Sequence, residues 1–163
     1  MFKNFLIYLF LLLFFVSCQN KSLFSQYKSI ETAWDIDRSI FFKFNISDTI
    51  NPYNLFIKLR TDNDYEFNNL FLDVSLIYPN NRILKDTLEY QMSQPDGSML
   101  GSGKMSIKEH TLWYKGFNDP FKFLEKGEYK IIINHAMRKR GKVKGLQQLK
   151  GVLDVGFTIE NNY

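Results

Sequence analysis

Alternation of apolar and polar residues with a period of two is the feature that most constrains the fold of this chain. Along residues 41–46, Phe42, Phe44 and Ile46 fall on one face. Strands with one buried face show this pattern, whereas an amphipathic helix repeats every 3.6 residues. Seven further segments are predicted strands on the same grounds: residues 53–60, 70–78, 83–92, 104–107, 111–114, 127–138 and 152–160. About eight strands are therefore expected.

Turn-forming residues separate these segments. Pro, Gly, Asn and Asp gather at residues 48–52, 62–64, 79–81 and 95–97, where they mark tight connections. No strong amphipathic helix is present, and one helical turn is predicted at residues 146–150. Short, evenly spaced strands predict an all-β fold, an antiparallel β-sandwich of jelly-roll or Ig-like type. Gly127-Glu128-Tyr129, before a strand, resembles the tyrosine corner of such sandwiches.

The first residues of the chain have the composition of a secretory signal. Lys3 supplies a positive charge, and an apolar run of 12 residues follows from Phe5 to Val16. A helix needs about 20 residues to cross a bilayer, so this run predicts a leader that is removed. Residues 1–17 are therefore assigned to a signal peptide.

Cys18, the only cysteine, lies where this leader ends. Phe15-Val16-Ser17-Cys18 resembles a bacterial lipobox, in which the cysteine is lipidated and becomes the new N-terminus. Acyl chains on Cys18 would hold the protein at a membrane outside the cytoplasm; an unpaired thiol is the alternative. Residues 18–30 are predicted to be a tether with a reach of about 40 Å, unless Phe24 and Tyr27 already dock on the domain. Residues 31–163 are assigned to the sandwich.

The positive charge is concentrated in one stretch. Residues 138–150 contain no acidic residue and six basic ones: Arg138, Lys139, Arg140, Lys142, Lys144 and Lys150. Outside this stretch and the leader, 14 basic residues stand against 17 acidic ones. Arg138, Lys139, Arg140, Lys142 and Lys144 are therefore candidates for binding a partner protein or anionic lipid headgroups. The alternative is a solvated connection between the last two strands. No nucleic acid is expected as a partner outside the cytoplasm.

Residues with catalytic or metal-binding spacing are scarce. His110 and His135 lie far apart, and His135 is expected to be a core histidine on an apolar strand face. Asp62-Asn63-Asp64 lacks the glycine and distal glutamate of an EF-hand loop, which favours a hairpin turn. No G-x-S-x-G nucleophile motif and no phosphate-binding glycine loop is present. We expect no enzyme activity, no metal and no cofactor.

Two alternative functions stay open at this level. Tyr90, Trp113 and Tyr114 would support a carbohydrate-binding lipoprotein if their rings were exposed and coplanar, although core packing is the simpler interpretation. A hydrolase would need two dispersed carboxylates to converge in an open cleft.

Several stretches of the chain resemble the gliding-motility lipoprotein GldH family. They are Trp34 with residues 42–48, residues 59–60 with 65–70, Pro79 with 86–88, Gly97 with 100–103, and residues 127–129, 135–138 and 151–156. Two features depart from the family pattern: Met99 stands where tryptophan is expected, and residues 139–150 are longer and more basic.

This resemblance implies a non-enzymatic cell-envelope lipoprotein connected with gliding and type IX secretion, whose partners are other proteins of that machinery. It offers no catalytic residues to transfer. Residues 19–23 after the cysteine carry no acid, whereas surface-displayed lipoproteins of such bacteria usually have acidic residues there. The expected location is therefore the outer membrane, with the domain in the periplasm.

Overall fold

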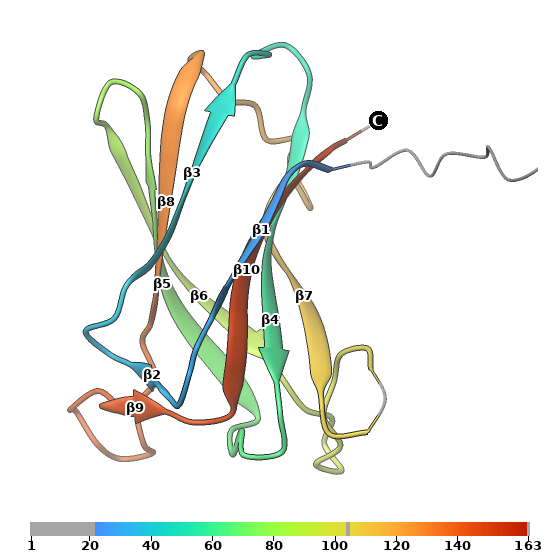
Figure 1. The fold of residues 1–163 in the computed structure, drawn as a ribbon, viewed down its shortest axis with the longest axis vertical. Coiled ribbons are helices and arrows are strands. Elements are labelled where there is room, and N and C mark those ends of the chain that lie inside the picture. The colour runs from blue at the N-terminus through green and yellow to red at the C-terminus, as the bar shows by residue number, and fades with distance from the viewer. Residues whose placement is uncertain (1–21, 104, 163) are drawn as a thin grey trace, which may run out of the picture.

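Two four-stranded antiparallel sheets pack face to face in the computed structural model, which describes residues 22–103 and 105–162 (Figure 1). The first sheet has the order β1 (Ser22–Ser29), β10 (Val152–Asn161), β4 (Tyr53–Thr61) and β7 (Lys108–Lys115). The second sheet has the order β3 (Ile40–Ile46), β8 (Gly127–His135), β5 (Asn69–Ile77) and β6 (Ile83–Gln91). A short pair, β2 (Trp34–Asp35) with β9 (Gln148–Leu149), lies at one end. The predicted all-β sandwich is confirmed.

The period-two pattern decides which side of each strand is buried. In β3 every second residue, from Ile40 to Ile46, is buried, and the residues between them are exposed. β8 repeats this on the paired strand, where Ile131 and Ile133 face the same side as Phe42 and Ile40. Because side chains alternate across a strand, each sheet presents one apolar face to the other.

Aromatic rings fill the space between the sheets. Phe44 in the second sheet lies 5.5 Å from the ring of Phe157 in the first sheet. It also lies 5.8 Å from both Phe123 and Tyr129, centroid to centroid. Such ring pairs add to the free energy gained by burying their area. With one cysteine in the whole sequence, the domain depends on this packing for its stability.

Tyr129 forms the predicted tyrosine corner. Its side chain is completely buried, and its hydroxyl donates to the carbonyl oxygen of Glu125 at 2.9 Å. The backbone amide of Glu125 donates a hydrogen bond to the oxygen of the same hydroxyl at 3.2 Å. These bonds hold the chain entering β8 against the core, as in other sandwiches.

Polar contacts close the edge between β6 and β7. The Tyr114 hydroxyl donates to Asp86 at 2.9 Å, and Lys115 pairs with the same carboxylate at 3.1 Å. The Tyr90 hydroxyl donates to the carbonyl of Trp113 at 2.7 Å. These bonds join the two sheets where backbone pairing stops, which covers the otherwise open strand edges.

The predicted tether is wrong from Ser22 onward, because Ser22–Ser29 is strand β1 of the first sheet. It pairs antiparallel with β10 along its length. Phe24 points between the sheets and lies 5.5 Å from Phe44 and 6.2 Å from Phe157. The alternative docking of Phe24 and Tyr27 on the domain is therefore correct, and the sandwich begins before residue 31.

Two local predictions are also wrong. Among residues 105–107 no strand forms, and β7 starts only at Lys108. Residues 146–150 form no helical turn, because Gln148–Leu149 pairs with Trp34–Asp35 as β9. Short segments with few side chains to alternate carry little periodic signal, so pairing partners decide their conformation.

Replacing Phe24 by alanine should destabilise the domain by about 2 kcal/mol, because it removes a half-buried ring from the aromatic core. Leu23→Ala is the matched control, since Leu23 is adjacent in β1 and its side chain is 49% exposed. Urea unfolding followed by circular dichroism measures both values. Equal, small losses in the two variants would show that β1 does not contribute to the folded domain.

Candidate functional site

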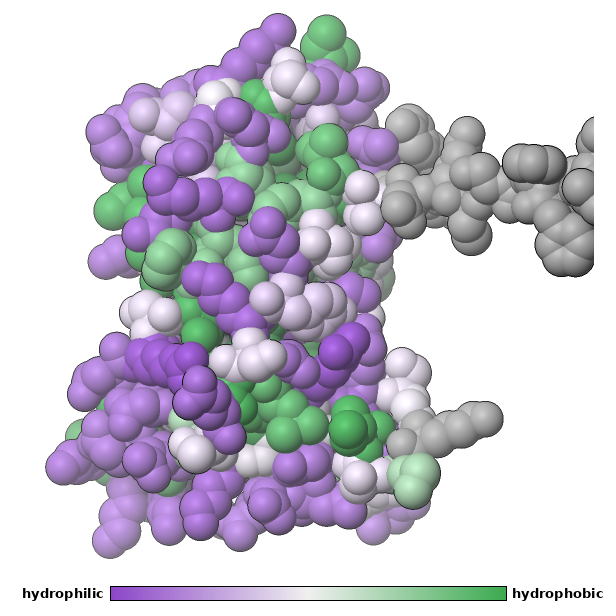
Figure 2. Space-filling view, viewed as in Figure 1, coloured by the Kyte–Doolittle hydropathy of each residue, from purple (hydrophilic) through white to green (hydrophobic). Residues whose placement is uncertain are grey.

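The basic stretch forms an exposed hairpin between β8 and β9, called here the basic hairpin (residues 138–145). Its base is closed by a bridge between Arg138 and Gly145 and by the amide of Leu146, which donates to Met137 at 2.7 Å. Figure 2 shows hydrophilic residues dominating the lower left of the view, where Figure 1 places this connection. Its five cationic residues are all exposed.

None of these cations has an ion-pair partner among the described residues. The ion pairs of residues 22–103 and 105–162 involve Lys43, Arg60 and Lys115, all outside the hairpin. At its tip, Val143 is 89% exposed between two lysines. The hairpin therefore presents positive charge and one apolar side chain to the surroundings.

Three of the five predicted site residues share a surface depression with the outer face of the second sheet. Its volume is about 780 Å³. The depression is lined by Arg138, Lys139 and Arg140 together with Ala136, Glu66, Phe67, Asn68, Asn69, Phe71, Asp73 and Thr87. Lys142 and Lys144 do not line it. Guanidinium and ammonium groups beside two phenyl rings can bind a ligand that carries both carboxylates and apolar groups.

The basic hairpin lies at the opposite end of the sandwich from the start of β1. The end of β1 reaches β10, since Ile30 donates its amide to Leu153 at 2.7 Å, next to β9. Ser22 pairs with Glu160 at the other end. The 8 residues of β1 span about 23 Å at roughly 3.3 Å per step. Figure 1 shows the two features at different ends of the molecule.

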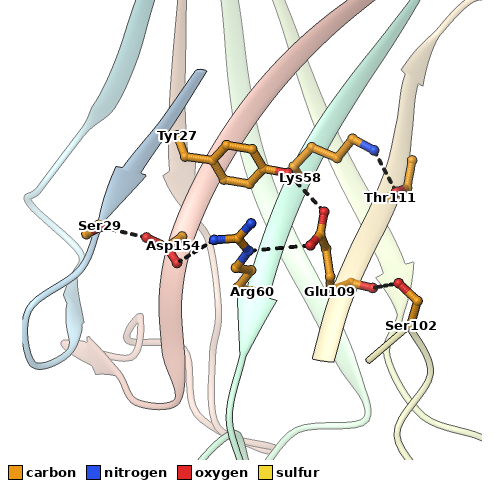
Figure 3. Close-up of polar contacts among 8 residues, drawn as sticks. All are labelled: Tyr27, Ser29, Lys58, Arg60, Ser102, Glu109, Thr111 and Asp154. Carbon is orange, nitrogen blue, oxygen red and sulfur yellow. Dashed lines mark hydrogen bonds and ion pairs between the residues drawn. The ribbon is translucent and has the colours of Figure 1, made fainter. Parts of the chain in front are cut away.

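A second polar surface crosses all four strands of the first sheet on its outer face (Figure 3). The Arg60 guanidinium lies between two carboxylates, 3.4 Å from Glu109 and 3.7 Å from Asp154. Ser29 donates to Asp154 at 2.6 Å, and Tyr27 donates to Glu109 at 3.0 Å. Sequence reasoning missed this network, because its members come from β1, β10, β4 and β7.

Gly156 makes this network possible. A Cβ atom at Gly156 would lie 2.7 Å from Cδ1 of Tyr27, closer than packed atoms approach. The absence of a side chain lets the Tyr27 ring lie across β10 and reach Glu109 on β7. Partial burial, with the hydrogen bond to the Glu109 carboxylate as a second cause, raises the pKa of Tyr27 to about 12. The network is thus neutral at Tyr27 and cross-links the strands.

The three aromatic residues proposed for carbohydrate binding do not form a shared platform. Tyr114 is buried between the sheets, and the hydroxyl of Tyr90 is bound to the backbone of Trp113. Trp113 alone points outward, and it packs at 53° to Phe56 and to Phe117. The condition for carbohydrate binding, exposed and coplanar rings, is therefore not met by these three residues, because alternation along β7 places Trp113 and Tyr114 on opposite faces.

The carboxylates of Asp62 and Asp35 accept hydrogen bonds from nearby backbone amides. Asp62 accepts the amide of Asp64 at 2.9 Å, and Asp35 accepts the amide of Asp37 at 2.9 Å. These bonds confirm a turn at residues 62–64. It is not the predicted hairpin turn, because the strands it connects, β4 and β5, belong to different sheets. Within residues 22–103 and 105–162, no group of three His, Cys, Asp or Glu residues is placed to hold a metal ion.

Both histidines are core residues of the sandwich. His110 Nε2 lies 3.1 Å from the Thr61 hydroxyl. His135 packs edge-on against Trp34, with ring centroids 5.4 Å apart, and neither ring nitrogen makes a hydrogen bond of good geometry. The predicted core position of His135 is confirmed, but its polar atoms are not satisfied by protein groups. Burial lowers the pKa of both histidines, assisted at His110 by Lys108.

The free energy of unfolding should fall as the pH is lowered from about 7.5 to 5, because the unfolded chain binds protons at its histidines before the folded one does. The ordinary histidine pKa of 6.5 sets the upper limit of this window. Asp48 and Asp96 have pKa values lowered from 3.8 by hydrogen bonds, so their contribution is lost only at lower pH. Urea titrations at several pH values measure the slope.

The slope should become shallower in His135→Phe, which removes one titrating group while preserving an aromatic side chain beside Trp34. His110→Gln provides the parallel variant at the other buried position. A wild-type protein whose stability does not change across this pH range would contradict the buried, neutral state of both rings.

The sheets and their closed edges define this domain as an all-β sandwich. Residues 22–159 match the family described as GldH lipoprotein. A gliding motility lipoprotein GldH homolog of Christiangramia forsetii is 42% identical over 96% of this chain and 94% of its own. The gliding motility lipoprotein GldH of Flavobacterium johnsoniae is 46% identical over 88% of this chain and 87% of its own. The chain belongs to the GldH lipoprotein family.

Likeness to solved structures is weak. The VP2 subviral particle of infectious bursal disease virus aligns with 85% of this chain and 33% of its own, at a TM-score of 0.35 and 14% identity. The described residues contain no helix that is long and apolar enough to cross a membrane. Cys18 and the signal peptide lie outside the described residues, so lipidation at Cys18 stays a prediction.

Proposed function

We propose that this gliding-motility lipoprotein is anchored by acyl chains on Cys18 and acts by binding another protein of the cell envelope through its basic hairpin. It serves the gliding and type IX secretion machinery without enzymatic activity of its own. Its anchor lies in the outer membrane and the sandwich faces the periplasm, as the absence of acidic residues at positions 19–23 suggests.

The observation that carries this proposal is the unpaired charge of the basic hairpin. Arg138, Lys139 and Arg140 line a depression whose only acidic residues are Glu66 and Asp73. Neither acid forms an ion pair with them within the described residues. Complementary charge on a partner would guide its approach and its orientation.

The composition of the depression supports a protein partner. Arginine and aromatic residues dominate the binding energy of many protein interfaces, and here arginines lie beside Phe67 and Phe71. An acidic segment with one or two apolar side chains would fit such a surface. The exposed Val143 at the hairpin tip adds a further apolar contact.

The position of the hairpin favours a partner protein over lipid headgroups of the anchoring membrane. If Cys18 is lipidated, the chain enters the sandwich at Ser22, and the hairpin lies about 23 Å farther along β1. Headgroup attraction decays within a Debye length of about 8 Å at physiological salt. Charges at that distance are better placed to attract a partner protein than to attract the headgroups of the membrane.

Crosslinking and affinity capture from the native bacterium test whether the lipid-anchored protein binds an envelope partner. Wild-type protein should recover motility or secretion components, and Cys18→Ala should recover them poorly because it is no longer held at the membrane. A wild-type protein that captures no envelope partner would overturn the proposal.

Neutralising the hairpin should weaken partner binding by about tenfold, equivalent to about 1.4 kcal/mol. The variant combines Arg138→Gln, Lys139→Gln and Arg140→Gln. The control combines Lys43→Gln, Arg82→Gln and Lys85→Gln, which removes the same charge at exposed positions elsewhere. Quantitative mass spectrometry of captured proteins provides the readout, and equal losses in both variants would exclude a specific role for the hairpin.

A further inference from the structure

Exposed apolar side chains gather at the end of the sandwich where β1 begins. Ile50 is 77% exposed, Phe117 70% and Leu124 65%. Together with three other exposed apolar residues at this end they form a group called here the apolar rim: Leu23, Ile50, Ile83, Trp113, Phe117 and Leu124. Figure 2 shows apolar residues at the upper end of its view, among hydrophilic ones.

Strand pairing places these residues at one end. Glu160 pairs with Ser22 of β1 and with Asn54 of β4, so the start of β1 is level with the start of β4 and the loop before it, which holds Ile50. On the far edge, the ion pair between Lys115 and Asp86 aligns the end of β7 with the first half of β6. Phe117 and Ile83 therefore extend beyond the same end.

The connection from β7 to β8, residues 116–126, is attached to this end by a buried ring and by hydrogen bonds. Phe123 is completely buried and packs 5.4 Å from Tyr53 and 4.8 Å from Tyr129. The amide of Tyr53 donates to Phe121 at 2.8 Å, and Asn80 of the neighbouring turn donates to Glu125. With Phe123 inserted, Leu124 must point outward, so its exposure is a consequence of the fold.

Trp113 extends the rim onto the outer face of the first sheet. Its ring is 37% exposed and lies 4.3 Å from Phe56 and 5.2 Å from Phe117. Tryptophan and phenylalanine are favoured at the boundary between lipid headgroups and acyl chains. Lys122 and Lys126, both exposed, flank Leu124 in sequence and suit contact with phosphate groups.

The length of chain before β1 identifies what covers this rim. Three residues lie between Cys18 and Ser22, so the two positions are four steps apart and at most about 14 Å from one another. With acyl chains on Cys18, the end of the sandwich that carries the rim is held within that distance of the bilayer. The other end, with β2, β9 and the basic hairpin, is about 23 Å farther along β1.

We propose that the apolar rim rests on the bilayer that holds the Cys18 acyl chains, so that the sandwich stands on the membrane with the basic hairpin directed away from it. This proposal depends on the lipidation in the proposed function. It adds that contact between the rim and the membrane orients the domain, whereas the anchor alone would only keep the domain near the membrane. The acyl chains then hold the domain at the bilayer, and the rim contact sets its orientation.

A pair of labelling variants tests the orientation in the lipidated full-length protein. In that protein the sulfur of Cys18 is in a thioether, so Leu124→Cys or Val143→Cys introduces the single free thiol. Both positions are highly exposed, one on the rim and one on the basic hairpin. Each is labelled with an environment-sensitive fluorophore after reconstitution into phosphatidylethanolamine and phosphatidylglycerol vesicles.

We expect the label at position 124 to shift to the blue and to be quenched by lipids with brominated acyl chains. The label at position 143 should keep its aqueous spectrum. Identical aqueous spectra at both positions in vesicle-bound protein would overturn the rim contact while leaving the anchor intact. A protein that does not float with the vesicles would overturn the anchor and the rim contact together.

Intrinsic fluorescence gives an independent readout without introduced cysteines. Trp34 is fully buried at the end with β2, whereas Trp113 belongs to the rim. Brominated lipids should therefore quench part of the emission of the unmodified lipidated protein. That quenching should disappear in Trp113→Phe, and its persistence there would contradict the proposed orientation.

Discussion

The contact between aromatic rings of the two sheets is the interaction on which this structure depends. Phe44 contacts rings from both sheets and from the connection before β8. Because the chain has a single cysteine, at position 18, no internal disulfide replaces this packing. Recruitment of Phe24 into the same cluster explains why β1 belongs to the domain. Phe123, buried beside Phe44, likewise determines the path of the connection that exposes Leu124.

The two outer faces and the two ends then have different characters. The outer face of the first sheet is cross-linked by Tyr27, Arg60 and Glu109, which satisfy one another and leave little for a ligand. The basic hairpin instead offers cations without partners in the described structure. The apolar rim lies at the opposite end. A domain whose two ends differ in this way can be oriented by a membrane at one end and bind a protein at the other.

Much of the fold follows from local patterns. Alternation correctly predicted the buried faces of β3, β4, β5, β8 and β10, since a period of two assigns side chains to a face whatever strand lies next to them. The tyrosine corner at Tyr129 was predicted from Gly127-Glu128-Tyr129 before a strand, and it depends on a local bond, from the hydroxyl to the backbone four residues upstream. The tether prediction failed because alternation in β1 is weak. Phe24 packs between the sheets, whereas Tyr27 lies across the outer face and binds Glu109. The site was predicted only as a charged stretch, without its depression.

By itself, the sequence determined the all-β class, the inward face of the long strands, the concentration of positive charge in residues 138–150 and the family. Only the tertiary structure decided the order of strands, because backbone hydrogen bonds between strands are the same for any side chains. It therefore decided every contact across strands, such as Tyr27 with Glu109, which are 82 positions apart. The separation of the basic hairpin from the apolar rim is likewise a property of strand direction and register, which no local pattern records.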